Sequence, residues 1–110
     1  MKLPNAEHAE VPPEKLRDYL LSPSHPVGRF KARFFQSIGY NLDNWEALSE
    51  FLLGVARTGE VEEVPSPYGR KFRIIAELAT VTGEELPVVT VWILSSNAAA
   101  PRFVTAYPLE

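Results

Sequence analysis

The sequence predicts an α+β fold, in which two or three amino-terminal helices pack on one face of a carboxyl-terminal antiparallel sheet of about four strands. Apolar residues recur at helical spacing in the first half of the chain and alternate with polar residues in the second half. The length of 110 residues is enough for one hydrophobic core and too small for two. We therefore expect a single domain over residues 1–110, with an extended arm at 1–11, a helical part at 12–58 and a β-meander at 60–108.

Two helices are expected before residue 40. The first opens on a pair of prolines, which the opening turn of a helix tolerates, and covers residues 12–22 with Leu16, Tyr19 and Leu20 on one apolar face. The second covers residues 24–39, with Ser24 as its N-cap and Gly39 as the residue that stops it. At about four turns, the second segment is the main helix candidate.

The remaining elements follow from a capping pattern and a change of period. Asp43 and Glu46 form a capping box that opens a third helix, which runs to about residue 57. Its apolar stripe at helical spacing comprises Trp45, Leu48, Leu52 and Val55. Beyond Gly59 the period becomes two, and the β-branched and aromatic segment LPVVTVWIL is the strongest strand. The expected strands are residues 61–64, 71–78, 86–94 and 102–107. In the last of them, simple alternation puts Arg102, Val104 and Ala106 on one face and Phe103, Thr105 and Tyr107 on the other.

The second helix shows two faces on a helical wheel. A core stripe within about 80° of arc comprises Val27, Phe30, Phe34 and Ile38. The opposite face comprises His25, Arg29, Arg33 and Gln36. The arginines have two interpretations, an ordinary solvated surface or contacts to phosphate groups. Lys31 lies at the edge of the apolar arc, where its ammonium either reaches solvent or meets a partner at the helix–sheet interface.

Basic residues are concentrated in two windows, although the net charge of −3 argues mildly against a nucleic-acid binder. No Asp or Glu occurs between residues 19 and 42 or between residues 64 and 76, and these windows hold six of the eleven Lys and Arg residues. The six are Arg29, Lys31, Arg33, Arg70, Lys71 and Arg73. If the fold brings the windows together, they form a positive patch that attracts an anionic ligand.

Several classes of protein are disfavoured by what the sequence lacks. Without cysteine there is no disulfide, thiol nucleophile or thiolate metal site. No zinc-protease, P-loop, dinucleotide or GxSxG motif is present, so we expect neither a metal nor a cofactor. No apolar run approaches roughly 18 residues, and the first residues do not resemble a signal peptide. We therefore expect no membrane span and a cytoplasmic location.

Two groups of residues could carry chemistry. His25 falls in the first turn of a helix, where the dipole favours a neutral imidazole that can act as a general base, although a lone histidine is also often structural. The second group lies on the predicted strands and on the turn before them, and consists of Tyr68, Arg70, Lys71, Arg73, Thr90, Thr105 and Tyr107. Its hydroxyls could surround a phosphate, or could simply suit a pleated surface.

Six segments form an ordered set over nearly the whole chain. They are LPNAEHA at 3–9, KLRDYLL at 15–21, HPVGRFKARFFQSIGY at 25–40, YGRKF at 68–72, TVWI at 90–93 and RFVTAYP at 102–108. Together they resemble a family of uncharacterised bacterial domains, a domain of unknown function of about this length. Its members occur as stand-alone proteins beside a small partner protein and at the carboxyl ends of polymorphic toxins. More remotely, helices followed by a sheet that ends in a Thr-x-Tyr strand are similar to the barnase, EndoU, colicin and RelE group of ribonucleases.

This resemblance implies a toxin-like effector that cleaves RNA without a metal, by attack of the 2′-hydroxyl on the adjacent phosphate. His25 would then be the base or acid, Lys31 and Lys71 would stabilise the phosphorane, and Thr105 and Tyr107 would orient the phosphate. The second general acid or base that such a reaction needs is not evident, unless Tyr107 or a lysine with a lowered pKa serves.

The remaining predicted residues would contact substrate. Arg29 and Arg33 would hold flanking phosphates, giving affinity that falls with salt. The implied partners are RNA and a cognate small antitoxin-like protein. Two alternatives stay open: a non-enzymatic module that docks an acidic partner through the basic patch, and a structural protein in which the two windows never meet.

Overall fold

The chain, described here by a computed structural model over residues 1–80 and 82–109, places three α-helices before a four-stranded sheet. The helical elements are the 3-10 helix η1 (Ala6–His8), α1 (Pro13–Lys15), its π-helical continuation η2 (Leu16–Leu20), α2 (Gly28–Ser37) and α3 (Trp45–Thr58). The strands are β1 (Val61–Val64), β2 (Arg70–Ala79), β3 (Glu85–Leu94) and β4 (Arg102–Pro108). The predicted α+β class is confirmed.

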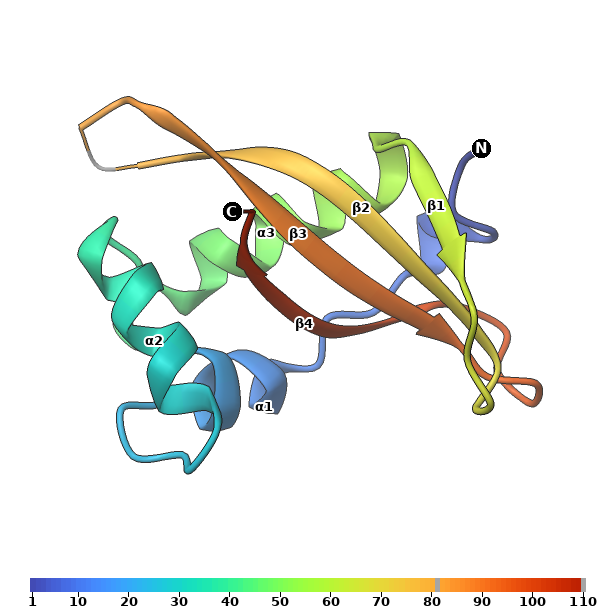
Figure 1. Cartoon of the computed structure of the whole chain (residues 1–110), viewed down its shortest axis with the longest axis horizontal. Coiled ribbons are helices and arrows are strands. Elements are labelled where there is room, and N and C mark those ends of the chain that lie inside the picture. The colour runs from blue at the N-terminus through green and yellow to red at the C-terminus, as the bar shows by residue number, and fades with distance from the viewer. Residues whose placement is uncertain (81, 110) are drawn as a thin grey trace.

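The sheet is an antiparallel meander with the order β1-β2-β3-β4. It is long and strongly twisted, with α3 running behind β2 and β3 (Figure 1). The other helices, α1 with η2 and then α2, lie instead beside β4 at one edge of the sheet (Figure 1). This edge is therefore the place where residues from the first basic window meet the last strand.

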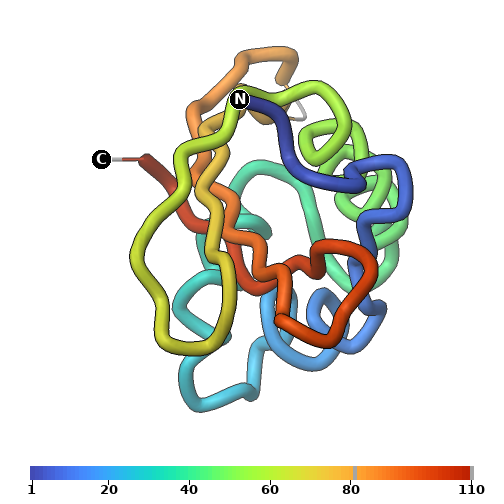
Figure 2. Tube along the Cα trace, turned by 90° about the vertical axis from the view of Figure 1, so that its right-hand side faces the viewer, coloured from blue at the N-terminus to red at the C-terminus, as the bar shows by residue number. Residues whose placement is uncertain are grey.

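One hydrophobic core joins the helices to the sheet. Its largest members, Trp92, Phe35, Phe72 and Phe103, are fully buried. The rings of Trp92 and Phe103 pack edge to face, with 5.5 Å between their centroids. In Figure 2 the strands and the green coil of α3 lie on opposite sides of the molecule, with this core between them.

The amino-terminal residues, expected as an extended arm, contain η1 and lie against the rest of the chain. Leu3 is buried in the core. The amino group of Met1 pairs with Glu60 at 3.0 Å, and the Met1 carbonyl accepts the backbone N–H of Val61 at 2.9 Å. The first residues are thus held at the start of β1.

The start of α2 differs from the prediction. His25, and not Ser24, acts as the cap: its carbonyl accepts the Arg29 N–H at 3.1 Å, and its Nδ1 accepts the N–H groups of Val27 and Gly28 at 3.0 and 2.9 Å. These are the bonds that an N-cap residue makes, with an imidazole nitrogen in place of the usual oxygen. Gly39 ends the segment with a φ of 104°, as expected.

The predicted core stripe of α2 is wrong at its first two positions. Val27 and Phe30 are 58% and 57% exposed, whereas Ala32 and Phe35 are buried. The cause is Gly28, which packs so closely on the backbone of η2 that a Cβ there would clash with a carbonyl oxygen. That contact fixes the orientation of the first turn of α2. Further along the helix, Ile38 is buried as predicted and Phe34 is partly buried against the core.

The predicted capping box of α3 is also wrong. Asn44 precedes the helix and makes no side-chain cap. Its side chain instead donates to the Gly39 carbonyl and accepts the Asn41 N–H, which ties α3 to the end of α2. The apolar stripe of α3 is confirmed, since Leu48 and Leu52 are buried.

A β-bulge changes the phase of β4. Val91 pairs with Thr105 while Trp92 pairs with Phe103, so one residue of β4, Val104, is left over. The predicted strict alternation is therefore wrong. Phe103 and Ala106 are both buried in the core, although in a regular strand residues three apart would lie on opposite faces.

No helix in the described part of the chain is long and apolar enough to cross a bilayer.

Candidate functional site at the β4 edge

Four side chains meet beside β4, and we call them the β4-edge cluster: Tyr19, Lys31, Thr105 and Tyr107. The ammonium of Lys31 donates to the Tyr19 hydroxyl at 2.7 Å and to the Thr105 hydroxyl at 3.1 Å. The two hydroxyls are themselves 3.2 Å apart. The same ammonium lies 6.0 Å from the ring centroid of Tyr107. Three elements, η2, α2 and β4, thus contribute to one polar group.

Two local features bring this cluster together. Gly28 allows α2 to contact the backbone of Tyr19, and Lys31 follows one turn later on the same helix. The bulge in β4 places Thr105 opposite Val91, on the other face from Phe103. A side chain re-aimed by a bulge is common next to functional sites.

Lys31 carries the positive charge of the cluster. Within residues 1–80 and 82–109, no carboxylate lies within ion-pair distance of its ammonium. Lys15 adds a second positive charge, with its ammonium 5.7 Å from the Tyr19 ring centroid. An ammonium has three donors and two are used here, so one remains for an incoming acceptor.

These charges alter Tyr19. Burial is the largest single influence and raises the pKa of its hydroxyl. The hydrogen bonds from Lys31 and Thr105, together with the charges of Lys31 and Lys15, lower that pKa by more than burial raises it. Tyr19 therefore releases its proton more readily than an ordinary tyrosine.

His25 borders the cluster, since its ring packs edge to face on Tyr19 with 5.0 Å between centroids. Its Nδ1 accepts two backbone N–H groups and so holds no proton in this arrangement. Only Nε2 is left for proton transfer, which stays a prediction for this residue.

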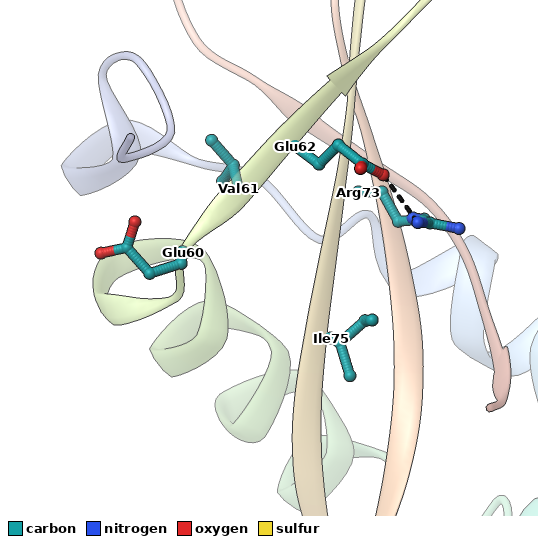
Figure 3. Close-up of a pocket in the computed structure, with 5 residues that line it drawn as sticks. All are labelled: Glu60, Val61, Glu62, Arg73 and Ile75. Atoms are coloured by element: carbon teal, nitrogen blue, oxygen red, sulfur yellow. Dashed lines mark ion pairs between the residues drawn. The ribbon is translucent and has the colours of Figure 1, made fainter.

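The second basic window makes no hydrogen bond or ion pair with the cluster among the described residues, although Arg73 lines the same shallow depression as Tyr107. Arg70 makes a two-pronged ion pair with Glu63 at 2.9 and 3.1 Å, and Arg73 pairs with Glu62 at 2.6 Å (Figure 3). The Arg70 hydrogen bond lowers the pKa of the Glu63 carboxyl. Pairing of β1 with β2 thus brings a carboxylate to each of these two arginines and neutralises their charge.

The other predicted strand and turn residues are also separate from the cluster. Lys71 lies on β2, two strands away, and its β3 partner Ile93 pairs with Arg102 and not with Thr105. Tyr68 is 81% exposed in the turn before β2.

Thr90 has a structural role. It is fully buried, donates to the Ile74 carbonyl at 3.0 Å and accepts the indole N–H of Trp92 at 3.0 Å. The buried indole N–H makes no other side-chain hydrogen bond among the described residues, so it depends on Thr90 for its acceptor. The arrangement leaves no hydroxyl of Thr90 for a ligand.

Sequence reasoning missed Tyr19, which was placed among the apolar residues of the first helix. The available signal was a lone hydroxyl on a face that otherwise carries Leu16 and Leu20. Its partner in the cluster could not be identified from spacing alone, because Thr105 is 86 residues away.

The surface near the cluster is open and not deeply hollowed. A shallow depression beside it is lined by Arg73, Val89, Tyr107, Pro108 and Leu109. In the described parts of the chain, no group of three or more His, Asp or Glu side chains is arranged to hold a metal ion.

The fold and the cluster define a small α+β domain with a four-stranded meander and a cationic group at its last strand. The chain belongs to the family described as a domain of unknown function, DUF6883, whose match covers residues 2–110.

A solved structure with a similar fold is the contact-dependent growth inhibition toxin–immunity protein complex from Klebsiella pneumoniae 342. One of its chains superposes with a TM-score of 0.67 over 96% of this chain and 97% of that chain, at 14% sequence identity. At this identity the likeness is one of fold. No curated protein matches the sequence.

Proposed function

We propose that this chain is a toxin-like effector that cleaves RNA without a metal ion, with the β4-edge cluster as its reaction centre. The observation that carries the proposal is the Lys31 ammonium, which is held by the hydroxyls of Tyr19 and Thr105 and has no carboxylate partner among the described residues. A phosphate oxygen is the natural acceptor for its remaining N–H. Ammonium and hydroxyl groups suit a phosphate better than a divalent cation.

In the proposed reaction, each member of the cluster has one role. The Tyr19 oxygen, whose pKa is lowered, takes the proton of the ribose 2′-hydroxyl as the 2′-oxygen bonds to phosphorus. Lys31 stabilises the charge on the pentacoordinate phosphorane, and Thr105 orients its oxygens. The bond to the 5′-oxygen then breaks, and that oxygen takes a proton from Tyr107. The products are a 2′,3′-cyclic phosphate and a 5′-hydroxyl.

The fold gives this proposal further support. A chain in a complex between a growth-inhibition toxin and its immunity protein has the same architecture. We propose by analogy that a small cognate protein neutralises this chain in the cytoplasm, by covering the β4 edge.

The test is cleavage of total RNA by the purified protein in the presence of a metal chelator. We expect fragments that end in 2′,3′-cyclic phosphate, and loss of cleavage by roughly a hundredfold or more in Lys31→Met. Lys2→Met is the matched control, because Lys2 lies at the amino terminus beside Glu60. Circular dichroism would establish that both variants fold. Intact RNA after incubation with excess wild-type protein would overturn the proposal.

A second candidate is a non-enzymatic module that docks an acidic partner through Arg29 and Arg33. It is favoured by the position of these arginines on α2, where neither has a carboxylate within ion-pair distance in residues 1–80 and 82–109. It predicts a complex that survives Lys31→Met and is weakened by Arg29→Glu combined with Arg33→Glu, measured by coelution with the partner.

A further inference from the structure

The surface of α2 exposes an aromatic ring that the core does not use. Phe30 is 57% exposed, and Val27, one turn earlier on the same side, is 58% exposed. The helix buries Ala32, Phe35 and Ile38 instead. Val27 and Phe30 therefore form an exposed apolar pair at the start of α2, outside the core.

Two guanidinium groups border this ring. The Arg29 guanidinium lies 4.5 Å from the Phe30 ring centroid, and that of Arg33 lies 5.8 Å from it. Arg29 is also anchored by a hydrogen bond to the Pro26 carbonyl at 2.8 Å. The result is a plate in which guanidinium groups stack over an exposed aromatic ring through cation–π contacts.

The plate adjoins the β4-edge cluster through the chain itself. Lys31 follows Phe30 directly, and successive side chains on a helix are separated by about 100° of rotation. The ring and the cluster ammonium therefore lie on neighbouring faces of α2. A ligand that contacts both the plate and Lys31 therefore spans two adjacent faces of the helix.

We propose that Phe30, Arg29 and Arg33 form a nucleotide platform, on which a base of single-stranded RNA stacks while the guanidiniums hold the neighbouring phosphates. This inference rests on the proposed function and adds to it the form of the substrate. Aromatic rings stack on any exposed base, and basic residues beside them track the phosphate backbone. Bases in an RNA duplex are already stacked on one another, so the platform selects unpaired strands.

The experiment measures binding by fluorescence anisotropy, with a labelled single-stranded oligonucleotide whose riboses are 2′-O-methylated so that it cannot be cleaved. Phe30→Ala should weaken binding about tenfold to a hundredfold, whereas Phe30→Trp should retain it. Leu42→Ala, which shortens another exposed apolar side chain in the loop after α2, is the control and should bind as the wild type does.

The salt dependence separates the two contributions. Arg33→Gln should lower the slope of log affinity against log salt by about one, because one phosphate contact is lost. Phe30→Ala should leave that slope unchanged, because stacking releases no counterions. Equal changes of slope in both variants would contradict the assignment of roles.

Unchanged oligonucleotide binding by Phe30→Ala would overturn the platform, as would equal affinity for a duplex of the same sequence. Loss of binding to polyglutamate with RNA binding intact would also overturn it, in favour of a protein-docking surface. If wild-type protein and Phe30→Ala cleave RNA equally well, the platform fails while the nuclease proposal stands. If wild-type protein binds the oligonucleotide through Phe30 and leaves RNA intact, the platform stands and the nuclease proposal fails.

Discussion

Lys31 and Tyr19 change each other's chemistry, because the ammonium of one donates to the hydroxyl of the other at 2.7 Å. The contact stabilises the ionised form of Tyr19 and lowers its pKa against the opposing effect of burial, which is the largest single influence. Tyr40 provides the contrast within the same chain, since burial alone raises its pKa. A proton-transfer role for Tyr19 depends on this difference.

The difference can be measured by titrating tyrosinate absorbance. We expect the first tyrosine to ionise to be Tyr19, and its transition to be absent from Tyr19→Phe. In Lys31→Met, the Tyr19 transition should move to higher pH, because the hydrogen bond and the charge are both lost. A transition that stays in place in Lys31→Met would show that the ammonium does not control Tyr19.

The same shift has a defined effect on stability. Because the pKa of Tyr19 is lower in the folded chain, its ionisation favours folding. This contribution is present in full above the ordinary tyrosine pKa and is lost as the pH falls through the lowered value. Below the lowered pKa the contribution is absent, so any stability change in Tyr19→Phe at such a pH reports only the lost hydrogen bonds.

His25 has a capping role that explains its place in the sequence without catalysis. We expect His25→Ala to destabilise the protein by about 1 kcal/mol, because two backbone N–H groups lose their acceptor. His25→Asn should restore most of that stability, because an Asn side chain accepts the same N–H groups. Denaturant unfolding provides the measurement. If RNA cleavage is lost in the stable His25→Asn variant, the imidazole takes part in the reaction through Nε2.

The contact between α2 and η2 depends on the absence of a side chain at Gly28. A Cβ there would clash with the carbonyl of Tyr19, a backbone atom that cannot rotate away. The close approach sets the phase of α2 and brings Lys31 to the Tyr19 hydroxyl. A packing contact at one end of the helix thus positions the cluster one turn later.

Gly28→Ala should therefore disturb both stability and the cluster. We expect a loss of about 1–3 kcal/mol, the usual cost of overpacking, together with a rise in the pH at which Tyr19 ionises. Thermal unfolding and tyrosinate titration would measure the two effects. Gly54→Ala is the control, because a Cβ at Gly54 meets no atom within 4 Å and alanine favours the helix. Equal stability of both alanine variants would contradict the close contact.

Pairing between strands explains why the two basic windows behave differently. Glu62 and Glu63 lie just before the second window in the sequence, and the pairing of β1 with β2 folds them back onto Arg73 and Arg70. The first window contacts β4 and makes no comparable ion pairs among the described residues. A sequence window without acidic residues therefore does not by itself predict a positively charged surface.

At the scale of the whole molecule, a polar bridge lies in the core, where Thr90 links the Trp92 indole to the Ile74 carbonyl. Every side-chain N and O atom that is buried in the described residues has a hydrogen-bond partner. Removal of one member leaves a buried donor unsatisfied in the layer between helices and sheet. The bridge therefore contributes to global stability.

Thr90→Val should destabilise the protein by about 1–3 kcal/mol, because the indole N–H loses its acceptor while the side-chain volume hardly changes. Thr90→Ser keeps the hydroxyl and should lose less. Denaturant unfolding of both variants checks this expectation. RNA cleavage by the folded fraction of Thr90→Val should equal that of the wild type, since Thr90 does not touch the β4-edge cluster.

The fold class and the strands were predictable because they depend on local pattern. Period-two alternation and β-branched residues identified all four strands to within one or two residues, and the apolar stripe of α3 was read correctly. Residues near each other in the chain determine such patterns. The three cluster members Lys31, Thr105 and Tyr107 were also named from the sequence, as a cation at an apolar edge and hydroxyls on a late strand.

The phase of α2, the face of Thr105 and the membership of Tyr19 were decided by contacts between distant parts of the chain. Local periodicity placed Phe30 in the core, but the approach of Gly28 to η2 turned the ring to solvent. Simple alternation put Thr105 on the same side as Phe103, but the bulge at Val104 separates them. A helix or strand pattern records which residues share a face, whereas the direction of that face depends on where the neighbouring element packs.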